Sequence, residues 1–226
     1  MCGRYLLYSS TDVLARAFGL DPTDRPNLAP RYNIAPTQDV PIVRLGEGRR
    51  RLDRARWGLV PSWAKDLAIG TKMINARSET AHEKPAFRQA FRARRCLVPA
   101  DGFFEWTSEN KVKQPWLLEP AAGGPIAFAG LFEHWRSPEG ESVQSCTILT
   151  TDASADIQHL HHRMPVILAE ASFDRWLEAT VDEARPLLCP APVGTLRARQ
   201  VDRRVNAVKY DDPSLIEPAP VQASLL

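Results

Sequence analysis

Long hydrophobic runs are absent from this chain of 226 residues. A membrane-spanning helix needs ~18 to 20 consecutive apolar residues, and no segment approaches that length. The apolar stretch Tyr5-Leu6-Leu7-Tyr8 near the start is far too short for the hydrophobic region of a signal peptide. We therefore expect a cytoplasmic protein with no membrane partner.

Cysteine is scarce as well, and no two of the four cysteines form a C-x-x-C pair. This spacing excludes a disulfide-rich scaffold and suits a reducing compartment, where an isolated cysteine keeps its thiol. Internal repeats and low-complexity segments are also absent. We expect residues 1–212 to form one domain and residues 213–226, with Pro218 and Pro220, to form a flexible tail.

The chain also lacks a large excess of charge of either sign. It has 29 Lys and Arg residues and 27 Asp and Glu residues, for a net charge of +2. Composition therefore does not by itself indicate a nucleic-acid-binding protein. Arginines do cluster within residues 49–56, 88–95 and 197–204. Such clusters are what a phosphate backbone requires, and they are equally typical of a solvated protein surface.

Strand-like patterns outnumber helical ones and come in clusters. The strand-like segments are residues 40–45 and 52–57 around a turn at 46–48, then 96–99, 102–106, 115–119, 126–135, 145–151 and 197–205. Strict alternation of strand and helix is absent. The pattern predicts an α+β fold, a single compact domain with a largely antiparallel, barrel-like β-sheet flanked by short helices.

Helical patterns are short, and most have a recognisable start or end. Residues 10–19 begin with Ser10 as a cap and end at Gly19, and a second helical stretch starts from Ser78 and resumes after Pro85. Further helices are predicted at residues 156–161, 172–179 and 182–188. Residues 25–37 are punctuated by prolines, so we expect coil there.

A cysteine follows the initiator methionine directly, in Met1-Cys2-Gly3-Arg4-Tyr5. Methionine aminopeptidase acts before a small second residue, so we expect a mature chain that begins at Cys2. Its α-amine and thiol, with ordinary pKa values near ~7.7 and ~8.5, then lie on adjacent carbons. Such an aminothiol condenses with an aldehyde to an imine, which the thiol closes to a thiazolidine. A buried apolar residue of a first strand is the structural alternative.

Two further segments gather side chains suited to binding and proton transfer. In residues 75–80, Asn75 can orient a small group and Arg77 can clamp a phosphate, unless the segment is only a helix cap with a surface arginine. In residues 159–165, three histidines suggest a metal, but no zinc-binding spacing completes a site. A single histidine acting as a proton shuttle fits better, and we expect neither a metal nor a cofactor.

Aromatic residues surround a carboxylate in Asp101-Gly102-Phe103-Phe104-Glu105-Trp106. In a strand, Phe103 and Glu105 share one face while Phe104 and Trp106 share the other. A carboxylate in such surroundings is suited to a raised pKa and to acid–base work, although an exposed edge position is the alternative. Tryptophans also bound residues 57–63, a predicted loop whose rings can stack on unpaired bases or pack on the core.

In order along the chain, six of these motifs resemble the successive signatures of the SRAP family, whose name stands for SOS response-associated peptidase. They comprise residues 1–4, 32–36, 57–63, 75–80, 101–106 and 161–165, and the match runs from Met1 to about Lys209. The resemblance implies a sensor of abasic sites in single-stranded DNA that crosslinks itself to the lesion. It also implies a compact, mostly β fold in which a basic DNA channel leads to the N-terminal cysteine.

The resemblance implies four catalytic residues. Cys2 would be the nucleophile, Asn75 would position it or the opened sugar, and Glu105 and His161 would move protons. The implied DNA contacts are Gly3, Arg4, Trp63, Arg77 and Trp106. Ala64 follows the loop tryptophan where some relatives carry a second aromatic residue, so the details of stacking stay open. The expected partner is abasic single-stranded DNA, with single-strand/double-strand junctions as a further site, and the expected state is a monomer.

Among the three histidines of residues 159–165, we assign the proton-transfer role to His161, because it precedes the x-Arg-Met-Pro end of its motif. We expect His159 to be a packed helix residue and His162 to face solvent. In the implied reaction the Cys2 amine attacks the C1′ aldehyde, the thiol traps the imine, and an untrapped imine gives weak lyase activity. Two other classes stay open: an N-terminal-nucleophile peptidase that removes its own methionine, with Asn75 in an oxyanion hole, and a non-catalytic single-strand-binding module.

Overall fold

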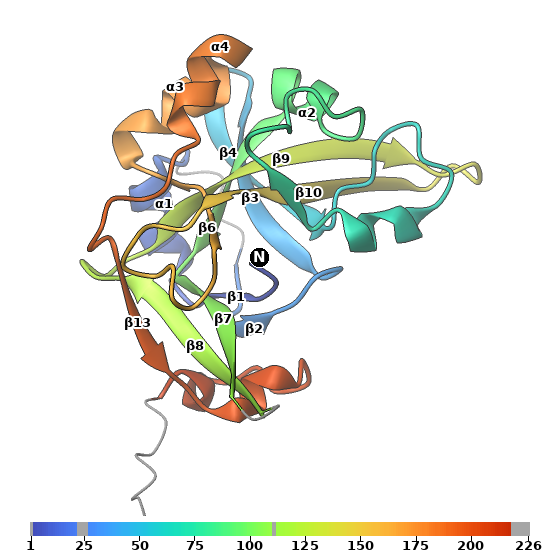
Figure 1. Cartoon of the computed structure of the whole chain (residues 1–226). Helices are drawn as coiled ribbons and strands as arrows, with labels where there is room; N and C mark the ends of the chain where they lie inside the picture. The colour runs from blue at the N-terminus through green and yellow to red at the C-terminus, as the bar shows by residue number, and fades with distance from the viewer. Residues whose placement is uncertain (1, 22–26, 110–111, 218–226) are drawn as a thin grey trace, which may run out of the picture.

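A closed barrel of five strands forms the centre of the molecule, in a computed structural model that describes residues 2–21, 27–109 and 112–217 (Figure 1). The barrel strands are β3 (Asp39–Gly46), β4 (Arg49–Trp57), β6 (Arg95–Ala100), β9 (Ile126–Arg136) and β10 (Ser142–Asp152). They follow the order β10-β4-β3-β6-β9, and β9 pairs back onto β10 to close the barrel. The pairings are antiparallel except for β4 with β10, which is parallel.

A second sheet of five antiparallel strands packs beside the barrel. Its order is β13 (Leu196–Gln200), β8 (Val112–Pro120), β7 (Gly102–Glu109), β1 (Tyr5–Leu7) and β2 (Arg31–Ile34). Three short strands extend the barrel: β5 (Asn75–Arg77) and β11 (Arg163–Pro165) on β10, and β12 (Ile167–Leu168) on β9. This arrangement confirms the predicted α+β fold and the barrel-like, largely antiparallel sheet.

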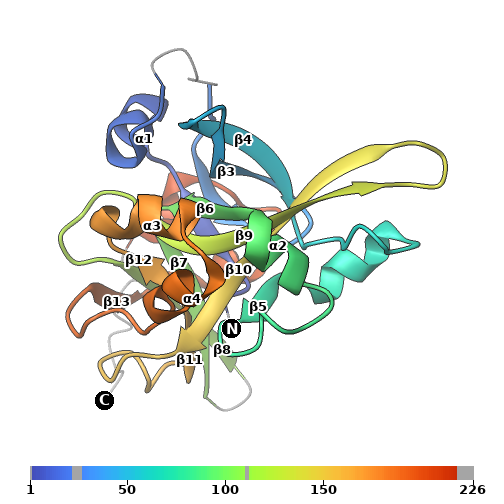
Figure 2. The ribbon, with the colours of Figure 1, turned by 90° about the horizontal axis from the view of Figure 1, so that it is seen from above.

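The helices are short and lie outside the sheets, with α1 beside β3 and β4, and with α3 and α4 above the barrel (Figure 2). The α-helices are α1 (Thr11–Phe18), α2 (Arg88–Ala93), α3 (Phe173–Glu178) and α4 (Val181–Ala184). The 3₁₀ turns are η1 (Leu67–Lys72), η2 (Glu170–Ser172), η3 (Arg185–Leu187), η4 (Arg203–Asn206) and η5 (Pro213–Ile216). Ser10 caps α1 and Gly19 ends it with φ of 59°, as the sequence predicts.

Two apolar clusters lie on opposite faces of the second sheet. Neighbouring residues divide between them, because Tyr5 and Phe103 join the cluster that fills the barrel whereas Leu6 and Phe104 join the other. The smaller cluster is completed by three buried residues of the C-terminal segment, Val201, Val205 and Leu215. The C-terminal segment therefore packs directly against the sheet that carries the N-terminal strand.

Several local predictions are wrong. Residues 31–34 form β2 rather than coil, because β1 offers them a partner. Residues 155–160 form turns rather than a helix, and Asp156 is held there by Ser154 and by the backbone of Gly194. The last strand ends at Gln200, and the chain continues as η4.

Two more boundaries differ from the prediction. The segment from Ser78 forms turns until α2 begins at Arg88. The predicted tail starts too early, because Leu215 in η5 is fully buried and residues 213–217 pack on the domain. The rest of the predicted tail, residues 218–226, lies outside the described residues.

Candidate functional site

Cys2 lies just before β1, in the segment that passes between the barrel and the second sheet (Figure 1). Its side chain is fully buried in the main apolar cluster, and its thiol lies 3.9 Å from the carbonyl oxygen of Arg4. Asn75, at the start of β5, donates a hydrogen bond of 2.7 Å from Nδ2 to the carbonyl oxygen of Cys2. The structure therefore joins two predicted catalytic residues that are far apart in the sequence.

Glu105 lies in β7 with its side chain buried, so the exposed-edge alternative is wrong. Burial raises the pKa of this carboxyl from 4.5 to about 7, because a carboxylate loses its hydration there. Burial also raises the pKa of the Cys2 thiol, and the nearby charge of Glu105 raises it further. The pair therefore combines a thiol that keeps its proton with a carboxyl that can take or give one at neutral pH.

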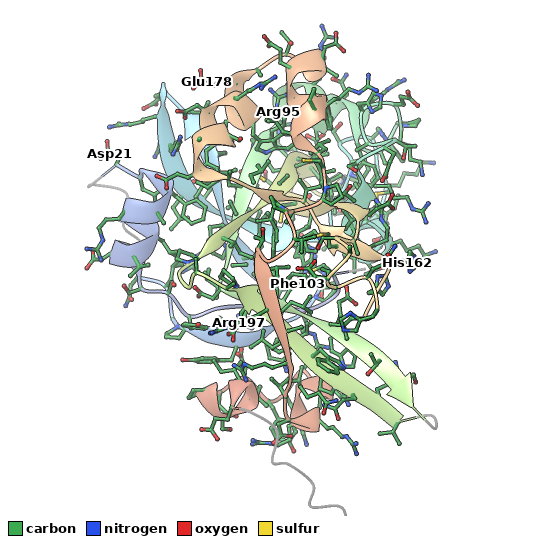
Figure 3. All side chains as sticks on the ribbon, turned by 60° about the vertical axis from the view of Figure 1, so that its left-hand side comes forward. Asp21, Arg95, Phe103, His162, Glu178 and Arg197 are labelled. Carbon is green, nitrogen blue, oxygen red and sulfur yellow. The ribbon has the colours of Figure 1, made fainter. Side chains whose placement is uncertain are left out.

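The aromatic residues around Glu105 lie as the strand pattern predicts. Phe103 faces the main cluster, whereas Phe104 and Trp106 pack in the smaller one. Figure 3 shows Phe103 in the interior of the molecule. Glu105 therefore shares the barrel-side face of β7 with Phe103, and Phe104 and Trp106 lie on the other face of the sheet.

His161 is half-buried and lies two residues before Arg163, where β11 begins. Its Nδ1 accepts a hydrogen bond of 2.9 Å from the backbone N–H of Arg163, which leaves the proton of the neutral ring on Nε2. Burial lowers the pKa of His161, which favours the neutral ring. Since β5 and β11 both pair with β10, at Thr150, the structure brings the histidine motif to the region of Asn75 and Arg77.

The other histidines of this motif are exposed. His162 faces solvent as predicted, and its ring stacks on that of His161 with 4.5 Å between centroids (Figure 3). His159 was predicted to be packed, but the structure exposes it, because the turns at residues 155–160 replace the helix whose face would have buried it.

The predicted DNA contacts occupy different environments. Arg77 is exposed on β5, Gly3 is half-buried, and the ring of Trp63 is exposed over 59% of its surface. Trp106 is half-buried and donates a hydrogen bond of 2.6 Å from Nε1 to Asn206. Arg4 is half-buried, with its guanidinium 6.0 Å from the centre of the Trp106 ring.

The loop that carries Trp63 is held by its ends. Trp57, at the end of β4, is fully buried and donates a hydrogen bond of 2.8 Å to the carbonyl of Ile74. Gly58 has φ of 127°, and a side chain there would meet the carbonyl oxygen of Gly70 at 2.6 Å. Trp57 therefore packs on the core, whereas Trp63 lies at the surface beyond this close approach of the two backbones.

Two residues with clear roles in building the site were missed. Arg163 is buried and binds Glu79 through both terminal nitrogens, at 2.6 and 2.9 Å, as well as Asp152 at 2.7 Å. It thereby fastens the histidine motif to the turn after β5. Asn33 is also fully buried and bridges β2 to the C-terminal segment. Both lie inside motifs that the sequence singled out, and polar residues at buried positions of a motif are the signal that could have found them.

Among residues 2–21, 27–109 and 112–217, no group of three or more His, Cys, Asp or Glu side chains is placed to hold a metal ion. Within the same described part of the chain, no helix has the length and apolar character that crossing a membrane requires.

Known proteins resemble this chain over nearly its whole length. It is 40% identical over 222 residues to the abasic site processing protein YoqW of Bacillus subtilis (strain 168), covering 96% of this chain and 99% of that protein. It is 32% identical over 224 residues to the abasic site processing protein HMCES of Gallus gallus, covering 84% of this chain and 66% of that protein.

Solved structures and a family model give the same picture. A crystal structure of a protein from Bacteroides thetaiotaomicron matches with a TM-score of 0.84 and 25% identity, over 96% of this chain and 100% of that one. A second crystal structure, of a protein from Bordetella bronchiseptica, matches with a TM-score of 0.79 and 29% identity. The match covers 89% of this chain and 100% of that one. The model of the SOS response associated peptidase (SRAP) family matches residues 1–208. The chain therefore belongs to the SRAP family.

Proposed function

We propose that this protein processes abasic sites in DNA by crosslinking its N-terminal cysteine to the lesion. The observation that carries the proposal is the contact of Cys2 with Asn75 beside the buried carboxyl of Glu105. Family membership supports the same function, because relatives at 40% and 32% identity are named abasic site processing proteins. The lesion is bound in single-stranded DNA, and a single-strand/double-strand junction is a further substrate.

The proposed reaction starts from the chain without Met1. The free α-amine of Cys2 attacks the C1′ aldehyde of the ring-opened sugar and forms a carbinolamine. Loss of one water molecule gives an imine. The thiol sulfur then adds to the imine carbon while its proton passes to the imine nitrogen, which closes the thiazolidine. One water molecule leaves in total, and no oxidant or reductant is needed.

Burial of the site makes the proton transfers of this reaction harder, because charged forms of the reacting groups lose their hydration. The thiol of Cys2 holds its proton because burial raises its pKa, so addition to the imine requires a nearby base. Glu105, whose pKa is about 7, takes this proton or supplies one to the leaving hydroxide. The neutral ring of His161 donates a hydrogen bond from Nε2 to the sugar oxygen as the sugar ring opens.

DNA binding is assigned to the residues around this site. Arg77 contacts a phosphate, Gly3 lies against the strand, and Trp63 and Trp106 pack against the bases or the site. These contacts do not read base edges, so the proposal includes no sequence preference. The protein acts as a monomer in the cytoplasm, at the nucleoid if its source is bacterial.

Two lesser activities belong to the same proposal. An imine that is not trapped by the thiol undergoes β-elimination, which gives weak lyase activity. A thiol peptidase activity restricted to removal of Met1 would use the same Cys2, with Asn75 stabilising the oxyanion.

The decisive experiment is intact mass spectrometry after incubation with an abasic single-stranded oligonucleotide. The wild-type protein should gain the mass of the oligonucleotide less one water, in an adduct that survives boiling in denaturant. Cys2→Ala keeps an amine but loses the thiol, so its adduct should appear only after borohydride reduction, and Cys2→Ser should give a weaker, reversible product. An equally stable adduct with Cys2→Ala would refute the thiazolidine, and an acyl-enzyme at Cys2 would favour the peptidase.

A further inference from the structure

Cys2 is two residues from an arginine whose backbone and side chain are both fixed. The carbonyl oxygen of Arg4 accepts the backbone N–H of Phe104 in β7 at 2.9 Å, and the thiol of Cys2 points to the same oxygen at 3.9 Å. Together with the bond from Asn75 to the Cys2 carbonyl, these contacts define where the thiol lies. The position of Arg4 is therefore part of the geometry of the nucleophile.

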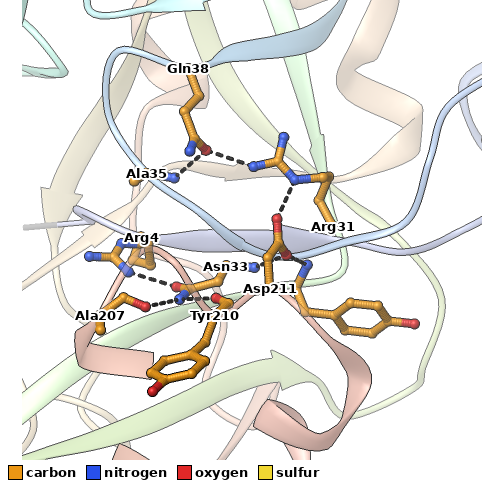
Figure 4. A network of polar contacts seen from close by, with 9 residues as sticks. Arg4, Arg31, Asn33, Ala35, Gln38, Ala207, Tyr210 and Asp211 are labelled. Atoms are coloured by element: carbon orange, nitrogen blue, oxygen red, sulfur yellow. Dashed lines mark hydrogen bonds and ion pairs between the residues drawn. The ribbon is translucent and has the colours of Figure 1, made fainter. Parts of the chain in front are cut away.

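The side chain of Arg4 is turned into the protein rather than left in solvent. Its Nη1 donates to Asn33 Oδ1 at 2.7 Å (Figure 4). The same nitrogen donates to the carbonyl oxygen of Val205 at 3.0 Å. Its guanidinium also lies over the ring of Trp106. The planar guanidinium places Nη1 at both acceptors while its carbon lies over the ring, a fixed geometry that the compact ammonium of a lysine, on its flexible stem, does not reproduce.

These partners belong to a segment that we call the C-terminal strap, residues 203–211. Asn33 is fully buried, and its Nδ2 donates to the carbonyl oxygens of Tyr210, Ala207 and Val205 at 2.7, 3.2 and 3.3 Å. One end of the Asn33 amide thus holds the strap while the other end holds Arg4. Figure 4 shows the amide between the two.

The strap is fastened a second time at its end. The carboxylate of Asp211 accepts the backbone N–H groups of Tyr32 and Asn33, and it pairs with the guanidinium of Arg31. Val205 packs in the smaller apolar cluster against the second sheet. The strap therefore holds the side chain of Arg4 in a fixed position. Arg4 and its partner Val205 are 201 residues apart in the sequence.

We propose that Arg4 is a positioning residue, which the C-terminal strap and Asn33 hold in place so that Cys2 stays buried and aimed for reaction. The proposal rests on the function of Cys2 proposed above. It differs from the phosphate contact expected for Arg4, because it requires the shape of the guanidinium and its inward bonds rather than its charge alone.

The variants Arg4→Lys and Asn33→Ser separate the two roles. Lysine keeps the charge, so a phosphate contact predicts nearly unchanged crosslinking, whereas positioning predicts a slow reaction. We expect both variants to lower the maximal crosslinking rate at saturating abasic single-stranded DNA by about tenfold, with the half-saturating DNA concentration unchanged. The double variant should be no slower than the slower single variant, because both act through one network.

A second measurement needs no DNA. Alkylation by iodoacetamide, followed by peptide mass spectrometry, reports the exposure of each cysteine, and we expect labelling of Cys2 to rise by about fivefold or more in both variants. Cys96 and Cys146 are fully buried in the barrel and should stay unlabelled, which shows that the fold is intact, while the exposed Cys189 gives the reference rate.

Two results would overturn the proposal. One is unchanged labelling of Cys2 in folded Arg4→Lys. The other is a wild-type crosslinking rate in Arg4→Lys together with a raised half-saturating DNA concentration in Arg4→Ala. Arg77→Ala should raise the same concentration, because Arg77 is proposed to contact a phosphate. If the wild-type protein forms no adduct through Cys2, the proposed function fails, whereas the labelling experiment still decides whether Arg4 holds Cys2 in place.

Discussion

Asn75 Nδ2 donates a hydrogen bond of 2.7 Å to the carbonyl oxygen of Cys2, across 73 residues of sequence. The opposite end of the same amide, Oδ1, is buried and makes no hydrogen bond to the residues that the structure describes. One side chain therefore anchors the backbone of Cys2, the proposed nucleophile, and presents a buried acceptor beside it. A buried acceptor without a partner is costly, and a hydroxyl or amine of the bound sugar adduct would satisfy it.

Asn75→Asp should slow crosslinking by roughly tenfold, equivalent to ~1.4 kcal/mol, because it replaces the donor with an oxygen that repels the Cys2 carbonyl. Asn75→Ala should have a similar effect, whereas DNA affinity should change little. A single-turnover time course at saturating abasic oligonucleotide measures the rate. If both variants react at the wild-type rate, the contact is only structural.

Glu105 should make the stability of the protein depend on pH. Its pKa is about 7 in the folded chain against an ordinary 4.5, so between these values the unfolded state ionises while the folded state keeps its proton. The free energy of unfolding of the wild type minus that of Glu105→Gln should therefore fall by roughly 3 kcal/mol as pH rises through this window. Above the window the difference should stay level. Denaturant titrations of both proteins at a series of pH values measure the difference, which should vanish below about pH 4. A constant difference would show that Glu105 titrates normally.

His161→Ala should slow crosslinking substantially with little loss of DNA binding. Burial lowers the pKa of His161, so the wild-type rate should persist to a pH below the ordinary histidine value of ~6.5 before acid protonates the ring. Time courses from about pH 5.5 to about pH 8.5 measure the profile. The exposed residues His159 and His162 supply matched controls, and alanine at either should leave the rate close to wild type. A slow His162→Ala beside a normal His161→Ala would reverse the assignment.

Arg77→Ala should weaken binding of single-stranded DNA more at physiological salt than at low salt. Loss of one phosphate contact should make the slope of log affinity against log salt shallower by ~0.7. Arg16→Ala removes the same charge from an exposed position on α1 and should leave the slope unchanged. Equal slopes for wild type and Arg77→Ala would assign Arg77 a role other than phosphate binding.

Trp63→Ala should cost affinity for single-stranded DNA but not stability. The ring is 59% exposed, so its loss removes little packing, whereas a stacked base contributes ~1 to 3 kcal/mol. Fluorescence anisotropy and thermal unfolding measure the two quantities. Trp57→Ala should do the reverse and lower the melting temperature, because Trp57 is fully buried. Unchanged affinity in Trp63→Ala would remove the ring from the binding surface.

Local patterns in the sequence were sufficient for the elements whose signals are local. The caps of α1, the turn between β3 and β4, and the alternation of Phe103, Phe104 and Glu105 depend on residues within a few positions of each other. The chemistry of an N-terminal aminothiol also follows from Cys2 alone. For these reasons the α+β class and most strands could be predicted before the structure was known.

Tertiary structure decided the conformation and burial of the segments whose contacts are distant in the sequence. Residues 31–34 became a strand because β1 pairs with them, and residues 155–160 remained turns because Gly194 and Ser154 hold Asp156. The two tryptophans of one loop received opposite environments from the contact of Gly58 with Gly70. Apart from Ser154, which is two residues from Asp156, these partners are distant in the sequence, so no local pattern could reveal them.

The candidate site divides in the same way. Sequence by itself determined which residue types carry the chemistry, since a thiol, an amide, a carboxyl and an imidazole have fixed reactivities wherever they lie. Only the tertiary structure decided that Asn75 grips the backbone of Cys2, that burial brings the pKa of Glu105 to about 7, and that Arg4 turns inward to Asn33. Distance and desolvation are properties of the packed fold, and no spacing along the chain contains them.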